Sequence, residues 1–159
     1  MSKENVPHQQ WAPMVSPAVV AVLIAAVAVF VIRITIPNLF SPPEYAVNET
    51  KAIEALRTLG SAQHLYHARY KVYTTLEVLH SVHAIDLALA KATTPENAKD
   101  GYYFRIEPGK DQWKGVALPA QPGKTGKRSF YMDHMAVIRQ AKCESTEDPP
   151  ANPTSPEVD

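Results

Sequence analysis

The sequence has very little cysteine, with Cys143 alone among 159 residues. One cysteine cannot form an intramolecular disulfide, and by itself it cannot hold a structural zinc ion. The chain also has no excess charge, because 16 Lys and Arg residues balance 16 Asp and Glu residues. This balance gives no reason to expect a protein that is steered as a whole toward nucleic acid.

The sequence also lacks the motifs of common enzyme classes. It contains no G-x-S-x-G nucleophile elbow, no Walker phosphate loop, no dinucleotide-binding G-x-G-x-x-G and no H-E-x-x-H metal motif. Residues 122–127, PGKTGK, have the wrong glycine spacing for a phosphate loop and indicate a hairpin turn. We therefore expect no enzymatic activity, no cofactor, no small-molecule substrate, and no catalytic, cofactor-binding or metal site.

A long apolar run is the most prominent feature that is present. Residues 18–32 are all apolar, and with their flanks they reach roughly 20 residues, about what a helix needs to cross a bilayer. We therefore expect a disordered leader at residues 1–14 and a transmembrane helix at residues 15–36. A cleaved secretory signal and a buried helix of a soluble core are the alternatives.

A second helical segment follows a joint at residues 37–47 that contains Pro37, Pro42 and Pro43. Asn48 is placed to cap this helix, which we expect over residues 48–71. Apolar residues at spacings of three and four form one stripe along it. The stripe consists of Ile53, Leu56, Leu59, Ala62, Tyr66 and Tyr70.

The pattern then changes from helical to strand-like. Residues 74–91 predict one or two shorter helices. Four short segments rich in aromatic and β-branched residues follow, separated by turn sequences, as in antiparallel hairpins. These segments are residues 101–107, 112–118, 128–133 and 135–140.

Helices followed by strands indicate the α+β fold class. We expect a long N-terminal helix, with a membrane part and an amphipathic part, packed on a small antiparallel sheet. The head would be an α+β domain at residues 48–142. The stretch at residues 143–159 is acidic and rich in proline, and it predicts a disordered tail.

Two groups of residues leave a binding role open. His64 and His67, like His80 and His83, are three residues apart on predicted helices, so each pair would share a face. Two such pairs could meet around zinc or copper, or they could simply be exposed histidines. Lys124, Lys127 and Arg128 form a basic turn that could touch DNA or an anionic surface, or could simply be solvated.

Several short segments occur in an order and spacing known from one family. They are Ile36-Pro37-Asn38-Leu39, residues 48–59, the tyrosines at 66, 70 and 73 with Thr74-Thr75-Leu76, residues 101–104, residues 122–133 and residues 136–139. Together with the apolar run they span roughly residues 18–140, and they resemble the type IV pilin-like family, which includes the pseudopilins of type II secretion. In that family the membrane helix bends at the proline that Pro37 matches.

The resemblance stops at the prepilin cleavage motif. Val15 and Ser16 stand where the family has its glycine and first mature residue, and Val20 stands where it has a glutamate. In the family the glycine permits cleavage, and the glutamate is thought to pair with the N-terminal amine of a neighbouring subunit. The resemblance therefore does not extend to prepilin cleavage or to the glutamate contact used in filament assembly.

The resemblance implies a membrane-anchored, pilin-like structural protein, a subunit or accessory of a type IV pilus or of a type II secretion pseudopilus. Its partners would be the lipid bilayer and further copies of itself or other pilin-like subunits. It would be a single-pass membrane protein with the C-terminal head on the extracytoplasmic side. The alternative is an uncleaved, signal-anchored envelope protein whose pilin-like head binds a partner or ligand without forming filaments.

Overall fold

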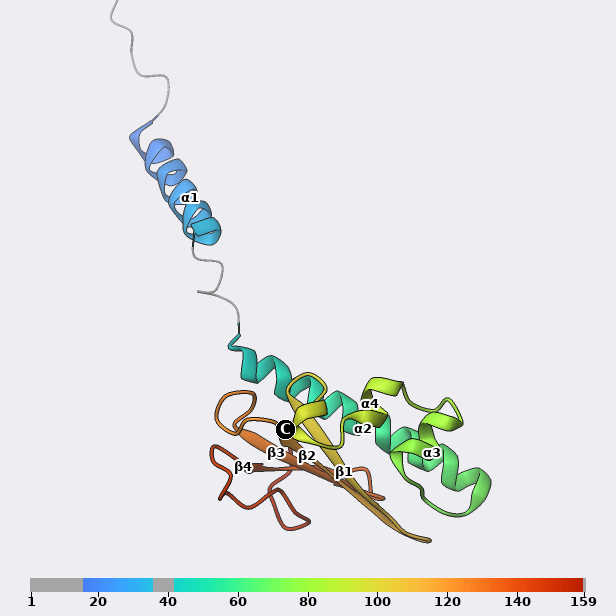
Figure 1. Ribbon diagram of the computed structural model, residues 1–159. Helices are drawn as coiled ribbons and strands as arrows, with labels where there is room; N and C mark the ends of the chain where they lie inside the picture. The colour runs from blue at the N-terminus through green and yellow to red at the C-terminus, as the bar shows by residue number, and fades with distance from the viewer. Residues whose placement is uncertain (1–15, 36–41, 159) are drawn as a thin grey trace, which may run out of the picture. The chain divides into compact units, whose positions relative to one another are not determined.

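The computed structural model describes residues 16–35 and 42–158, and the chain divides into two units, residues 1–41 and 42–159. The first unit contains helix α1 (Pro17–Thr35), drawn in blue in Figure 1. The side chains of residues 16–30 are all exposed. The predicted leader and the predicted bend at Pro37 lie outside the described residues.

The expected transmembrane helix at residues 15–36 is wrong. Across the described parts of the chain, no helix combines the length and the apolar character that crossing a membrane requires. The uninterrupted apolar run ends before Arg33, and its fifteen residues rise only about 22 Å, short of the roughly 30 Å hydrocarbon core. The membrane part of the predicted fold and the single-pass localisation are corrected with it.

The second unit is an α+β head, which confirms this part of the predicted fold. Its sheet is antiparallel with four strands in the order β1-β2-β3-β4. Helix α2 lies along the sheet, and the short helices follow it (Figure 1). The elements are α2 (Glu44–Tyr70), α3 (Leu76–Ser81), α4 (Leu87–Lys91), the 3₁₀ turn η2 (Pro95–Asn97), β1 (Tyr102–Pro108), β2 (Trp113–Pro119), β3 (Arg128–Asp133) and β4 (Ile138–Lys142).

Helix α2 begins four residues earlier than expected. Pro43 occupies the N-cap in an extended conformation, and Glu44 supplies an acid in the first turn, where the helix dipole favours negative charge. Asn48 is therefore not the cap. It is buried inside the helix, where its amide donates a hydrogen bond to the Thr125 carbonyl oxygen at 3.1 Å.

The core lies between α2 and the sheet. Leu56 and Leu59 of the predicted stripe are fully buried, whereas Tyr70 at the end of the stripe is 46% exposed. Gly60 permits close packing of the helix on the sheet, because a Cβ there would overlap the Met132 side chain. The largest fully buried side chains of the sheet are Trp113, Tyr102, Phe104 and Phe130.

A buried carboxylate fastens α2 to the start of β3. The Glu49 side chain is 4% exposed, and its Oε1 accepts a hydrogen bond from the Lys127 backbone N–H at 2.8 Å. Its Oε2 accepts a hydrogen bond from Nε of Arg128 at 2.8 Å, and Nη2 of the same guanidinium lies 2.7 Å from Oε2 as an ion pair. Tyr102 donates to the Arg128 carbonyl oxygen at 2.6 Å, and burial raises the pKa of this phenol far above its ordinary value.

A second buried side chain fixes the other end of α2. Gln63 is fully buried, and its amide oxygen accepts a hydrogen bond from the Thr74 N–H at 3.0 Å. Its amide nitrogen donates to the Thr74 carbonyl oxygen. The Gln63 side chain thus pairs both the N–H and the carbonyl oxygen of Thr74, in the segment that follows the helix. Glu49 and Gln63 together hold α2 at two points along its length.

The C-terminal stretch differs from the disordered tail that composition predicts, because residues 143–158 pack against the sheet. The Ala151 N–H donates to Ser129 Oγ at 2.9 Å, and the Val158 N–H donates to the Ile138 carbonyl oxygen at 2.9 Å. The tail thereby covers the edge of β4, whose backbone groups would otherwise lack partners. One of the acidic residues of this stretch, Glu157, forms an ion pair with Arg139 at 3.2 Å.

Removing Arg128 should destabilise the head more than removing the charge of Glu49. Arg128→Met leaves a buried carboxylate without its cation, which costs about 3–5 kcal/mol of unfolding free energy. Glu49→Gln leaves a guanidinium that is 41% exposed, so its cost should be about 1–3 kcal/mol. Urea unfolding of the two variants measures both values.

Lys124→Met on the same hairpin is the matched control, because Lys124 is exposed. It should change the unfolding free energy by less than about 0.5 kcal/mol. If Arg128→Met matched this control, the pair with Glu49 would not hold the helix to the sheet.

Candidate interaction surface

The four histidines take part in separate local contacts. The His67 ring stacks on Tyr73 with ring centroids 4.3 Å apart, and His64 meets the same tyrosine edge-on at 6.5 Å. His80 Nδ1 lies 3.1 Å from the Ile85 carbonyl oxygen. His83 follows the end of α3 with a positive φ of 59°, so the expected shared helix face for the second pair is wrong.

The described residues hold no group of three His, Cys, Asp or Glu side chains that could bind a metal ion. His67 stacks on an aromatic ring and His80 contacts a backbone carbonyl oxygen, so these two rings do not point toward a shared metal position. The histidines thus give no positive support to the zinc or copper hypothesis.

The predicted basic turn is largely directed inward. Arg128 binds Glu49, and the Lys127 ammonium lies 4.6 Å from the centroid of the Tyr45 ring on α2. Lys124 remains exposed at the tip of the turn. Two of its three cations therefore act within the head, and the turn offers little concentrated positive charge to a polyanion.

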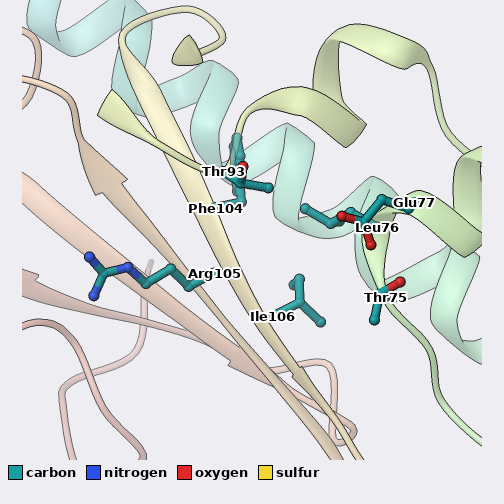
Figure 2. Close-up of a pocket in the computed structure, with 7 residues that line it drawn as sticks. All are labelled: Thr75, Leu76, Glu77, Thr93, Phe104, Arg105 and Ile106. Atoms are coloured by element: carbon teal, nitrogen blue, oxygen red, sulfur yellow. The ribbon is translucent and has the colours of Figure 1, made fainter. Parts of the chain in front are cut away.

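A groove of about 290 Å³ lies between the outer edge of β1 and the start of α3 (Figure 2). Phe104 and Ile106 form its strand side, and Leu76 and Glu77 lie opposite. Figure 2 shows the Arg105 guanidinium pointing away from these side chains. Thr75, Thr93 and Arg105 complete the lining, but the Arg105 guanidinium is turned away from Glu77. A catalytic or specific small-molecule site usually has polar groups that converge on one point.

A second cavity of about 290 Å³, between α2 and α4, is lined by two ion pairs that serve the fold, and by Glu54 and Thr58 of α2. Lys51 pairs with Asp100 at 2.6 Å, and Lys99 pairs with Asp86 at 3.4 Å. Asp86 caps α4 by accepting the Leu89 N–H at 2.7 Å, and this bond is the main reason why the pKa of its carboxyl is lowered. These carboxylates are structural acceptors, not groups held ready for acid–base chemistry.

A third cavity, of about 240 Å³, includes Trp113 and His134. Trp113 Nε1 and His134 Nδ1 are buried and have no hydrogen-bond partner among the described residues. Both atoms are covered by their surroundings, so a molecule in this cavity would not reach them without movement of the head. The arrangement does not define a ligand site.

The most distinctive exposed surface is the outer face of α2, turned away from the sheet. Apolar side chains stand at both of its ends, with Val47 39% exposed and Leu65 73% exposed. Between them lie Glu54 and Arg57, both exposed and without an ion-pair partner among the described residues. We call this surface the outer α2 face, and its members are Val47, Thr50, Glu54, Arg57, Thr58, Ser61 and Leu65.

The outer α2 face has only a weak signal in the sequence. Val47, Glu54, Thr58, Ser61 and Leu65 follow one another at intervals of seven, four, three and four residues, which places them in one row. The available signal was a pair of apolar residues within a row that is otherwise polar. Such a signal acquires meaning only when the opposite face is known to be buried.

The chain matches no protein-family model and no curated protein sequence. The resemblance to type IV pilin-like proteins is therefore neither supported nor opposed by these comparisons.

The only cysteine of the chain should be slow to react in the native state. Cys143 is 4% exposed, and burial together with the nearby Asp148 carboxylate raises the pKa of its thiol. The thiolate is the reactive form, so iodoacetamide at pH 7.5 should modify native Cys143 at least about tenfold more slowly than the urea-unfolded chain.

Mass spectrometry over time measures this rate. Lys110→Cys in a Cys143→Ser background is the control, since position 110 is exposed in a turn. Equal native rates for Cys143 and for this control would show that the burial of Cys143 does not persist in solution.

Proposed function

We propose that this chain is a non-catalytic structural subunit of the pilin-like kind, which acts by assembling with copies of itself or with related subunits. The observation that carries the proposal is the outer α2 face, where apolar ends and unpaired charges stand on a helix fastened at Glu49 and Gln63. A rigid surface binds with little loss of conformational entropy. The order of motifs along the chain supports the pilin-like assignment.

Helix α1 supports an assembling role independently of the head. All side chains of residues 16–30 are exposed, and most of them are apolar. A helix that is apolar on every side needs apolar surroundings, and equivalent helices of other subunits would supply them. The membrane anchor of the original expectation is not part of this proposal.

The way in which the head uses its polar groups favours assembly over catalysis. Its buried carboxylate, Glu49, is paired with a cation, and Asp86 caps a helix. Catalytic groups are usually found where several polar side chains converge in a deep pocket. In the groove beside β1, the Arg105 guanidinium instead points away from Glu77.

The test of this proposal is the mass of the purified full-length chain in solution. Sedimentation velocity and light scattering across the micromolar range should show species at whole-number multiples of the chain mass, which grow with concentration. Electron microscopy of the same samples would detect filaments. A monodisperse monomer at every concentration would contradict the proposal.

Two variants separate the contributions of the helices. Val27→Asp places a charge on the apolar surface of α1, and Leu65→Asp does so on the outer α2 face. Each should reduce the mean mass, because burial of a charge at an apolar interface is unfavourable. Leu87→Asp, on exposed Leu87 of α4, is the matched control and should leave the mass unchanged.

A further inference from the structure

We infer that two copies of this chain pair through their outer α2 faces, with the helices antiparallel about a two-fold axis level with residue 56. This inference rests on the proposed function and specifies its first contact. The occupant of the face is a second copy of the same chain, and each subunit contributes the same residues to both halves of the interface.

The register follows from the spacing of the exposed residues. When two antiparallel helices are level at residue 56, each position before 56 faces the position equally far after it on the partner helix. Val47 lies nine residues before this point and Leu65 nine residues after it, so the two exposed apolar side chains meet at both ends. The contact runs for about 27 Å along each helix.

The same register matches the free charges. Glu54 of one copy is level with residue 58 of the other, and Arg57 is one residue away, an axial offset of only about 1.5 Å. The two-fold axis repeats the contact, so both carboxylates face both guanidinium groups. Thr58 and Ser61 are small, and they allow the two backbones to approach.

A parallel arrangement of the same faces would be repulsive. It would place Glu54 beside Glu54 and Arg57 beside Arg57 of the other copy, and like charges across an interface are unfavourable. The antiparallel arrangement places each Glu54 about 1.5 Å along the axis from Arg57 of the other copy, closer than the two Arg57 residues are to each other, at about 3 Å. It also opposes the two helix dipoles. The charges therefore select the direction of pairing, while Val47 and Leu65 provide the apolar burial.

The strength expected of this contact is modest. One helix face with two apolar side chains per copy is small compared with the interfaces of permanent dimers. We expect association that depends on concentration in the micromolar range. A weak pair contact suits a subunit that reaches stability only in a larger assembly, where several contacts act together.

Disulfide cross-linking of the full-length chain tests the register. The variant Val47→Cys/Leu65→Cys, in a Cys143→Ser background, should give a covalent dimer on mild oxidation. Each single variant should give little dimer, because identical positions lie far apart along antiparallel helices. Glu77→Cys/Lys110→Cys, two exposed positions outside the face, is the matched control and should remain monomeric.

Charge reversal tests the pairing of Glu54 with Arg57. Glu54→Arg alone and Arg57→Glu alone should each raise the dimer dissociation constant by about tenfold, because each creates two repulsions. The double reversal Glu54→Arg/Arg57→Glu should restore the original constant within about threefold, since the opposite charges face each other again. Lys124→Glu controls for the change in net charge.

Sedimentation equilibrium measures these constants, and circular dichroism melts check that each variant folds. If the full-length chain associates but the cross-link fails and the double reversal does not rescue, the antiparallel register is overturned and the assembly proposal stands. If every form of the chain is monomeric, both fail. Dimer formation through the cross-link together with rescue by the double reversal establishes the contact.

Discussion

The head depends on one ion pair with a buried carboxylate, between Glu49 on α2 and the partly exposed Arg128 at the start of β3. A carboxylate that is 4% exposed is costly unless its oxygens are occupied, and here the Lys127 N–H and the guanidinium occupy them. The pair joins residues 79 positions apart in the sequence. It therefore places the helix on the sheet and also determines which side of the helix turns outward.

The side of α2 that faces solvent links the fold to the proposed association. Rotating α2 by one residue would turn Glu49 away from Arg128 and would move Val47 and Leu65 from the exposed row. Gln63 and the close contact of Gly60 with Met132 oppose the same rotation farther along the helix. The exposed row is thus as well defined as the core, although it contributes little to stability by itself.

Local patterns predicted the elements well and their tertiary connections poorly. The strand segments expected at residues 101–107 and 112–118 became Tyr102–Pro108 and Trp113–Pro119, because alternation and turn residues are local signals. The pairing of Glu49 with Arg128 has no local signal. Composition predicted disorder for the C-terminal stretch, but its backbone pairs with the edge of β4. The apolar run predicted a membrane span only together with its polar flanks, and no described helix is long and apolar enough for one.

A polar helix face with an apolar residue at each end is hard to interpret within one chain, because Val47 is 39% exposed and Leu65 is 73% exposed. Two-fold symmetry resolves this, since an antiparallel copy brings the far end of one helix to the near end of the other. The separation that makes each residue appear isolated then becomes the spacing that makes the face self-complementary. Glu54 and Arg57, near the centre, obey the same symmetry, so one operation accounts for both the apolar and the charged members of the face.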